Sequence, residues 1–401
     1  MSGEHVATQV APGFESRPLR HVFPTRKIMA DAETSVAERQ ARQRVRRRQA
    51  VRQGTKSSGT AREAPLPQAQ PLTMQPKTLI LTSNQIKRLI SMPEVLGAAE
   101  RAFKLYGKGL AQMPPKIYLH LDKYNGDFRA MPAYIQGVEA CGVKWVNVHP
   151  DNSRFGLPAV MALFILSDPR NGFPLAIMDA TYITNLRTGA AGGVAAKYLA
   201  RKNSSVIGLV GCGAQARSQL LALKELFRIK KVYVWGHKVE LARKFLKDMK
   251  HLGLDMEIKN KISDCVKCAD IVVTTTPVRK PIVKSEWIKP GAHINAIGAD
   301  AKGKEELEPA LLKRAKIVVD DWRQASHSGE INVPLSKGMI KPKDIYATLG
   351  DILTGKKKSR TSQKEITIFD STGLAILDVA AADLVYKKAI KKKIGSRIGI
   401  L

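Results

Sequence analysis

The sequence is poor in acidic residues, aromatic residues and cysteines, and it has no long apolar run. Only 35 residues are Asp or Glu, against 66 Lys or Arg, which makes the formal net charge +31 over 401 residues. Four cysteines are too few for a disulfide framework in such a chain, so we expect free thiols in a reducing, cytoplasmic compartment. No apolar stretch approaches the roughly 18 residues of a membrane-spanning helix. The first residues lack the apolar core of a secretory signal, so we expect neither a membrane protein nor a secreted one.

Two features that suggest other functions carry little weight. Cys265 and Cys268 have the CxxC spacing of redox and zinc sites, but no second Cys or His pair follows, so we expect no metal site. The positive charge raises a nucleic-acid hypothesis, yet many lysines are dispersed along amphipathic segments, as at Lys244, Lys247 and Lys250. Such lysines usually lie on a solvated face, so we expect no specific nucleic-acid partner.

Residues 1–73 differ in composition from the rest of the chain. They are rich in Arg, Gln, Ala and Pro, and their basic run Ala41–Arg48 has no opposing apolar face. We predict a disordered basic extension. The alternatives are a transit peptide, a nucleic-acid-binding arm, or a natural start at Met74 with upstream residues that are not native.

The remaining chain predicts an α/β fold. The first segment contains a helix and four strands, near residues 93–107, 116–122, 128–134, 142–148 and 160–166. Strand and helix patterns then alternate from residue 205, which is typical of a doubly wound parallel sheet of the Rossmann type. A closing helix is predicted over residues 373–391. We predict a Rossmann domain over residues 191–344, inserted into a discontinuous α+β domain of residues 74–190 and 345–401.

The segment Val206–Ala216 has the pattern of a buried strand, a glycine turn and the start of a helix. Gly211 permits a tight turn, Gly213 allows close approach of a pyrophosphate, and the small Ala216 allows tight packing of the helix on the strand. Phosphates would bind at the helix N-terminus, where unpaired N–H groups and the helix dipole favour anions. The motif therefore predicts a nicotinamide dinucleotide site.

The end of the second strand of this unit lacks the acidic residue that usually binds the ribose hydroxyls of NAD. Gly236, His237 and Lys238 stand there instead. A small residue followed by two potential cations favours a 2′-phosphate, and therefore NADP, or a loose choice between NAD and NADP. In the alternative, His237 and Lys238 point to solvent.

Two further segments follow strands at the carboxyl edge of the sheet, where ligands bind in open α/β folds. They are Thr274-Thr275-Thr276-Pro277 and Ile297-Gly298-Ala299-Asp300. Each proline or turn residue prevents the neighbouring segment from continuing as a central strand. Both segments are therefore expected near the ligand.

Three basic residues of the first segment are candidates for the substrate site. Lys144 lies in an apolar strand with small or apolar neighbours at even spacing, so its side chain is expected to point inward. A buried lysine has a depressed pKa and can act as an acid–base group, although it can also snorkel from an edge strand. Arg129 can bind a carboxylate through two N–H groups, and Lys116 can add a positive charge. Asp300 is a candidate proton acceptor or water-positioning group, or else a helix N-cap.

Arg187 and Thr188 begin a helix that is rich in small residues. Small residues let a ligand or another backbone approach closely. We assign both residues to cofactor binding, with Arg187 holding a cofactor phosphate or the substrate carboxylate. The alternative for Arg187 is a surface ion pair with an acid.

Taken together, these residues resemble the ornithine cyclodeaminase and mu-crystallin family, over the whole segment from about Met74 to Gly399. The motifs that carry the resemblance are Met113-Pro-Pro-Lys116, Arg129-Ala-Met-Pro132, Lys144-Trp145, Met178-Asp-Ala-Thr181, Leu186-Arg-Thr-Gly-Ala-Ala191, Gly211-Cys-Gly-Ala-Gln215, Asn295-Ala-Ile-Gly-Ala-Asp300 and Asp370-Ser-Thr-Gly373. Within the family, the chain is most similar to the archaeal alanine dehydrogenases. The arginine in the motif at Arg129 supports this choice, because it would repel the second amino group of ornithine.

The resemblance implies NAD(P)-dependent oxidative deamination of L-alanine to pyruvate and ammonia, the reverse reductive amination, and a homodimer formed by the substrate-binding domain. It implies that Lys144 donates and accepts protons with Asp300 as its catalytic partner, so we expect these two groups to meet across a cleft over the nicotinamide. It also implies cofactor contacts from Arg187, Ala214, Gln215, Thr274–Thr276, Ile297–Ala299 and Ser371. Relatives in the alanine dehydrogenase branch carry an acid where Gly236 stands, and this departure opens the choice between NAD and NADP.

Two alternatives stay open. One is another enzyme of the same family, an ornithine cyclodeaminase or a ketimine reductase. The other is a non-catalytic, crystallin-like binding protein, against which the presence of Lys144, Asp300 and the complete glycine turn argues.

Overall fold

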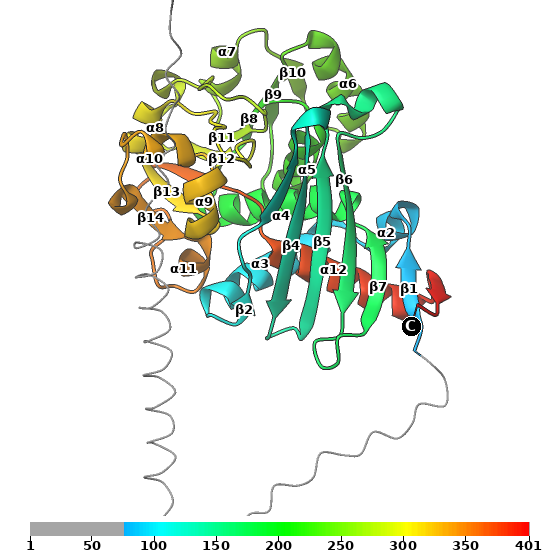
Figure 1. Ribbon diagram of the computed structural model, residues 1–401. Coiled ribbons are helices and arrows are strands. Elements are labelled where there is room, and N and C mark those ends of the chain that lie inside the picture. Colours follow the sequence, from blue (N-terminus) through cyan, green and yellow to red (C-terminus); the bar gives the residue numbers. More distant parts are fainter. Residues whose placement is uncertain (1–75, 401) are drawn as a thin grey trace, which may run out of the picture. The chain divides into compact units, whose positions relative to one another are not determined.

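The computed structural model describes residues 76–400, which form two eight-stranded β-sheets flanked by helices (Figure 1). The predicted basic extension, residues 1–73, lies outside the described residues. Among the residues described, no helix is long and apolar enough to cross a membrane. The four cysteines, all within this part, are free thiols.

The first sheet, sheet A, is mixed and has the order β16-β1-β7-β6-β5-β4-β2, with β3 also paired to β4. Its strands are β1 (Thr78–Leu81), β2 (Ala111–Gln112), β3 (Ile117–Leu121), β4 (Gly126–Ile135), β5 (Ala140–Val148), β6 (Val160–Ser167), β7 (Pro174–Asp179) and β16 (Ser396–Ile398). The two ends of the described chain meet here, because β1 pairs with β16. This pairing confirms that N- and C-terminal segments build one sheet.

The second sheet, sheet B, is parallel throughout and has the order β10-β9-β8-β11-β12-β15-β13-β14. Its strands are β8 (Val206–Val210), β9 (Lys231–Trp235), β10 (Met256–Ile258), β11 (Ile271–Thr274), β12 (His293–Ala296), β13 (Ala315–Val319), β14 (Ile345–Thr348) and β15 (Ile366–Asp370). Fully buried runs such as Ile271–Thr274 are typical of parallel strands that are covered on both faces. The predicted Rossmann-type sheet is confirmed.

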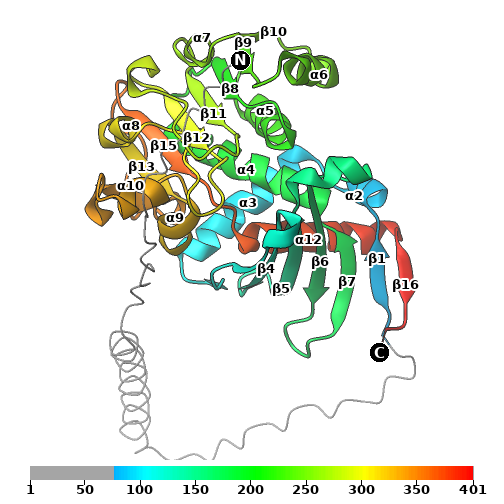
Figure 2. The same ribbon diagram turned by 45° about the horizontal axis from the view of Figure 1, so that its top comes forward.

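Helices surround both sheets (Figures 1 and 2). They are α2 (Ser83–Leu89), α3 (Met92–Gly107), α4 (Thr181–Leu199), α5 (Ala214–Leu226), α6 (Val239–Met249), α7 (Ile262–Val266), α8 (Pro309–Arg314), α9 (Trp322–Ser328), α10 (Asn332–Ser336), α11 (Leu349–Leu353) and α12 (Ala375–Lys392). The long helix α12 packs across β4, β5 and β6 and covers one face of sheet A. Helix α12 therefore packs on sheet A although it follows the strands of sheet B in the chain.

Helix α4 lies in the interior and connects the two sheets. Fourteen of its 19 residues are buried, which is why its sequence is apolar all round and rich in Ala and Gly. A Cβ at Gly189 would approach the Ser218 backbone oxygen to 2.3 Å, so glycine is required where α4 crosses α5. This close crossing brings Arg187, on α4, next to the carboxyl edge of sheet B.

Sheet membership differs from the predicted domain boundaries in two places. Residues 345–370 were predicted with the substrate-binding segment, but β14 and β15 belong to sheet B, where β15 pairs with β12 and β13. The boundary predicted at residue 190 falls inside α4. Apolar periodicity indicates that a segment is a strand, but it does not indicate which sheet the strand joins.

Candidate active site

The candidate site lies at the carboxyl ends of the sheet B strands, facing the inner side of β4 and β5. The chain reverses its direction across sheet B at β8, whose neighbours are β9 on one side and β11 on the other. Ligands of doubly wound sheets bind outside the carboxyl ends at such a point. The glycine turn after Val210 lies there, as the sequence predicted.

The glycine turn has the geometry of a phosphate-binding turn. Gly211 has φ +111°, and a Cβ there would approach Thr275 Oγ1 to 2.4 Å. Gly213 is the N-cap of α5, and no atom lies within 4 Å of the position its Cβ would take, so a ligand has room to approach the backbone. The first turn of α5, which begins at Ala214 and Gln215, has no acidic residue. The turn therefore favours an anion at the helix N-terminus.

Two threonines of the run at the end of β11 bind a buried carboxylate. Thr274 Oγ1 donates a 2.6 Å hydrogen bond to Glu306, and Thr276 Oγ1 donates another of 2.6 Å to the same carboxylate. The Thr276 and Gly298 amides also donate to Glu306, at 2.6 and 2.9 Å. Glu306 thus joins the ends of β11 and β12, and only Thr275 of the run is left with its side chain near the glycine turn.

Lys144 points inward from β5, as alternation predicted, and its side chain is only 1% exposed. Its Nζ lies 2.9 Å from Asp378 Oδ2 and donates a 3.3 Å hydrogen bond to Thr184 Oγ1. Burial lowers the pKa of Lys144 to about 7, assisted by the positive charge of Arg187 and opposed by Asp378. A lysine with this pKa can accept and donate a proton near neutrality.

The partner of Lys144 is Asp378 on α12, and not Asp300 as predicted. Within residues 76–400, no hydrogen bond or ion pair joins Lys144 to Asp300. Asp378 is fully buried and also accepts a 2.9 Å hydrogen bond from Arg187 Nε. One carboxylate therefore holds two cations from two different elements. This explains how Lys144 and Arg187 can be buried together.

Asp300 is held by a separate pair of cations. Its carboxylate lies 2.8 Å from Arg129 Nη1 and 2.6 Å from Lys304 Nζ. Burial alone would raise the pKa of Asp300, but the charges of Arg129 and Lys304 outweigh burial and hold it below its usual value. Asp300 is therefore a carboxylate at neutral pH and a weak base, which favours the water-positioning role over the proton-accepting one.

Arg129 lies on β4 with most of its side chain buried. Its Nε and Nη2 donate to Asp127 at 2.7 and 3.2 Å, and its Nη1 donates to Asp300. A guanidinium has five N–H donors, so two remain for a substrate carboxylate. The centroid of the Tyr118 ring on β3 lies 5.2 Å from the guanidinium carbon, which is a cation–π contact.

Lys116 connects the two groups of charges. Its Nζ donates to the Thr372 carbonyl oxygen in the loop after β15. Burial lowers its pKa to about 8, with Arg129 lowering it further and Asp300 raising it. The charge of Lys116 in turn lowers the pKa of Lys144. The charge of Lys116 is therefore coupled both to Asp300 and to Lys144.

The remaining predicted residues lie around the same edge of sheet B. Ile297 and Ala299 are buried in the segment after β12, and Thr188 is buried on α4. Gln215 donates a 3.1 Å hydrogen bond to Asn185 Oδ1. The Ser371 hydroxyl is buried, without a hydrogen-bond partner among the described residues, which leaves it available to a ligand.

Sequence reasoning missed several buried carboxylates, three of which lie close to the site. Asp378 holds Lys144, Glu306 joins the strand ends, and Asp320 accepts from the Thr372 and Gly373 amides at 2.6 and 2.9 Å. The signal for Asp378 was present, because it is an isolated acid in the apolar run Ala375–Ala382. A charge in such a run must find a partner, although the sequence does not say which.

Comparison with known proteins shows the family of the chain. The family model described as "Ornithine cyclodeaminase/mu-crystallin family" matches residues 76–393. The chain belongs to the ornithine cyclodeaminase/mu-crystallin family. Alanine dehydrogenase of Archaeoglobus fulgidus is 56% identical over 322 residues, which cover 80% of this chain and 98% of that protein.

Two solved structures of this family superpose on most of the chain. An archaeal alanine dehydrogenase dimer with bound NAD has a TM-score of 0.78 and 54% identity, covering 81% of this chain and 100% of the other. The Δ1-pyrroline-2-carboxylate reductase of Thermococcus litoralis, in complex with NADH and L-proline, has a TM-score of 0.78 and 40% identity, covering 80% and 99%. The α/β fold with a Rossmann-type sheet is thus that of the family.

Proposed function

We propose that the protein is an NAD(P)-dependent L-alanine dehydrogenase, which converts L-alanine, water and oxidised cofactor into pyruvate, ammonia and reduced cofactor. The observation that carries the proposal is the buried Lys144, paired with Asp378 at 2.9 Å, in a chain whose parallel sheet also carries a phosphate-binding turn. The 56% identity to an alanine dehydrogenase over nearly its whole length supports the choice of substrate.

The residues present fit a nicotinamide dinucleotide. The open backbone at Gly213, the acid-free first turn of α5 and the unpartnered Ser371 hydroxyl would hold it. When bound, the cofactor accepts the hydride from the substrate Cα. The protein contributes the orientation of the substrate, the exclusion of stray water and the proton transfers.

The substrate carboxylate is placed by Lys116 and by the two free N–H donors of Arg129. Loss of hydride leaves an iminium group on the substrate. Water, positioned by the Asp300 carboxylate, adds to the imine carbon and passes a proton to neutral Lys144. As the resulting carbinolamine collapses, Lys144 returns this proton to the amine and accepts the hydroxyl proton, so pyruvate and ammonia leave and Lys144 ends the step protonated. Asp300 stays ionised throughout, because Arg129 and Lys304 hold its pKa low.

The pH dependence of alanine oxidation follows from the two lysines. Lys144, with a pKa of about 7, must be neutral to accept a proton, so kcat/KM rises as the pH passes through about 7. Lys116, with a pKa of about 8, must be charged to bind the carboxylate, so kcat/KM falls as the pH passes through about 8. We expect a narrow bell between these values, measured as kcat/KM for L-alanine from roughly pH 6 to pH 10. A profile that is flat over this range would contradict the assignment of both lysines.

The decisive test separates this activity from that of the ornithine cyclodeaminases in the family. Purified protein is incubated with L-alanine and either NAD+ or NADP+, and reduced cofactor is followed by absorbance. A parallel incubation contains L-ornithine without added cofactor and is analysed for proline. We expect reduction with alanine and no proline. Proline without alanine-dependent reduction overturns the proposal, and inactivity with both substrates favours a binding protein.

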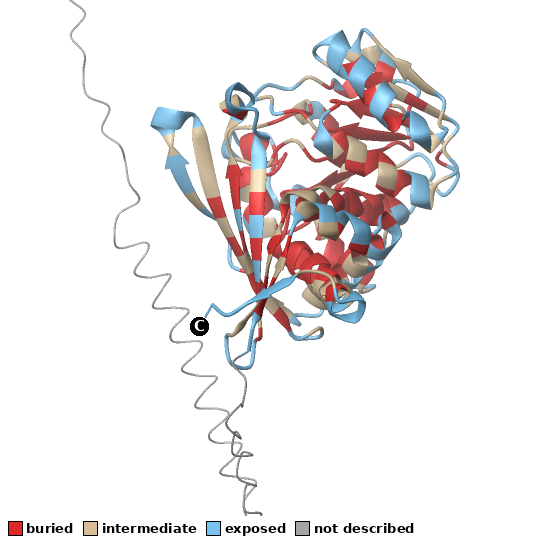
Figure 3. Cartoon of the chain, turned by 90° about the vertical axis from the view of Figure 1, so that its right-hand side faces the viewer, coloured by how far each residue is buried: buried red, intermediate tan, exposed pale blue. Residues whose placement is uncertain are grey.

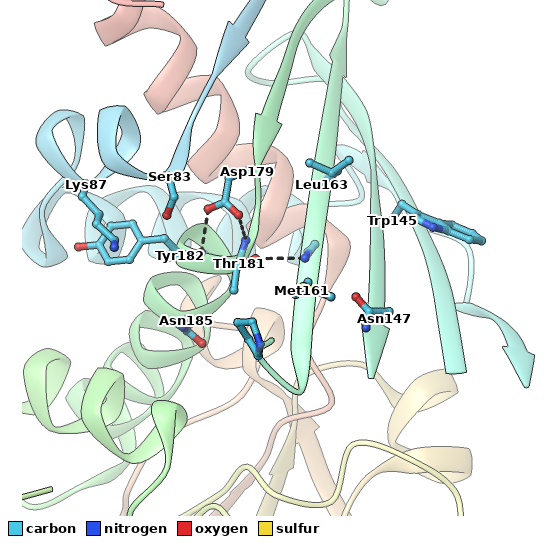
Figure 4. Close-up of a pocket in the computed structure, with 12 residues that line it drawn as sticks. Ser83, Lys87, Trp145, Asn147, Met161, Leu163, Asp179, Thr181, Tyr182 and Asn185 are labelled. Carbon is cyan, nitrogen blue, oxygen red and sulfur yellow. Dashed lines mark hydrogen bonds between the residues drawn. The ribbon is translucent and has the colours of Figure 1, made fainter. Parts of the chain in front are cut away.

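We further propose a homodimer formed through the open face of sheet A. Exposed residues alternate with buried ones along several strands of sheet A (Figure 3). The exposed face carries apolar side chains: Trp145 is 44%, Leu163 54% and Ile165 38% exposed. Trp145 and Leu163 are direct cross-strand partners, and both line an open hollow of about 760 Å³ (Figure 4). An exposed apolar sheet face of this kind is typical of an interface. The archaeal relative with bound NAD is a dimer.

Leu163→Asp is expected to convert the dimer into a monomer, because it places a charge on the apolar face. The mass is measured by sedimentation velocity. The matched control is Leu241→Asp on α6, where the leucine is 41% exposed but lies outside sheet A. A monomeric wild type, or a Leu163→Asp variant that stays dimeric, contradicts the proposed interface.

A further inference from the structure

The end of β9 lies directly against the glycine turn. The Gly211 amide donates a 2.9 Å hydrogen bond to the Trp235 carbonyl oxygen, so residue 236 follows at the edge of the dinucleotide site. In Rossmann units, the residue at this strand end usually supplies the carboxylate that binds the ribose hydroxyls and repels a 2′-phosphate. Here that position is Gly236, which has no side chain.

Cys212 occupies the space that a side chain at position 236 would need. A Cβ at Gly236 would lie 2.7 Å from Cys212 Sγ and 3.3 Å from the Lys238 carbonyl oxygen. Cys212 is buried between the two glycines of the turn, and burial raises the pKa of its thiol, so the group is neutral. The position therefore holds neither an acceptor for ribose hydroxyls nor a negative charge.

The charged groups nearby are mostly positive. His237 and Lys238 are exposed, and Lys238 is the N-cap of α6. Arg217 donates 2.6 and 3.0 Å hydrogen bonds to the Cys212 and Gly213 carbonyl oxygens, and its other nitrogen pairs with Asp248 at 2.7 Å. The first acidic residue after Lys238 is Glu240, in the first turn of α6.

We propose that the Cys212–Gly236 contact sets the cofactor choice by excluding a carboxylate from the ribose position, and that the protein binds NADPH at least as tightly as NADH. The inference rests on the dinucleotide site of the proposed function. The neutral thiol removes the repulsion of a 2′-phosphate, and Lys238 supplies the positive charge that attracts it.

Direct binding tests the inference without turnover. The dissociation constants of NADPH and NADH are measured by the fluorescence of the bound reduced cofactor, without amino acid. We expect the dissociation constant of NADPH to be equal to or lower than that of NADH. A lower dissociation constant for NADH overturns the inference and leaves the dehydrogenase proposal intact. Binding of neither cofactor overturns both.

Four variants test the residues. Gly236→Asp alone is expected to weaken both cofactors, because Cys212 crowds the new side chain, whereas Cys212→Ala with Gly236→Asp gives at least a tenfold preference for NADH. If Gly236→Asp alone prefers NADH as strongly as the double variant does, Cys212 has no role in the cofactor choice. Lys238→Ala is expected to weaken NADPH about tenfold and leave NADH unchanged, with Lys247→Ala, exposed at the other end of α6, as the matched control. Equal effects of the two lysine variants overturn the role of Lys238.

Discussion

Lys144→Met is expected to lower kcat for alanine oxidation by about 10²–10⁴-fold while leaving NADH binding unchanged. Methionine has nearly the shape of lysine but has no ammonium. The variant therefore removes the proton-transfer group, whose pKa lies at about 7, and keeps the packing around it. The buried Asp378 keeps a counter-ion, because Arg187 also binds it at 2.9 Å. The fold should therefore tolerate the change.

Single-turnover rates separate this result from misfolding, and cofactor fluorescence reports the binding site. The control is Lys224→Met on α5, an exposed lysine that takes no part in the site. A Lys144→Met variant that keeps kcat within tenfold of wild type contradicts the proton-transfer role. A variant that loses cofactor binding as well indicates that Lys144 is structural.

Asp378→Asn is expected to produce two separate effects. The first is on catalysis: Asp378 raises the pKa of Lys144, so its removal lowers that pKa below about 7 and moves the acid limb of the kcat/KM profile to lower pH. The second is on stability. Lys144 and Arg187 lose their shared carboxylate, and breaking a buried pair costs roughly 3–5 kcal/mol, which lowers Tm by roughly 4–7 °C in a protein of this size.

The pH profile and Tm are measured on the same preparation. Asp383→Asn is the control, because Asp383 lies on the same helix but, within residues 76–400, its ion pair is with the exposed Lys387 at 2.7 Å. Such surface pairs are worth about 0.3–0.5 kcal/mol, so neither the profile nor Tm should change detectably. If the acid limb of Asp378→Asn stays in place or moves to higher pH, Asp378 is not the group that sets the pKa of Lys144.

Local patterns were enough to predict much of this protein. The alternation in β5 predicted that Lys144 faces inward, because successive side chains of a strand point to opposite faces. The glycine motif predicted the geometry of the turn, because the positive φ at Gly211 and the open space at Gly213 depend on residues within one turn. The regular alternation of strand and helix patterns predicted the parallel sheet.

The partners of the charged residues were not predictable in the same way. Lys144 and Asp378 are separated by 234 residues, and Arg187 and Asp378 by 191. Several acids could have satisfied Lys144, and Asp300 was the one predicted, but α12 crosses β5 and brings Asp378 to it. Similarly, the place of β15 between β12 and β13 depends on pairing between segments far apart in the chain.

The amino-acid sequence by itself determined the elements, the phosphate-binding turn, and which side chains face the interior, because these properties depend on neighbours within a few residues. Only the tertiary structure decided which carboxylate holds Lys144 and which sheet receives β15. Both outcomes depend on contacts between segments far apart in the chain, and a buried charge is satisfied by whichever opposite charge the packing brings within reach.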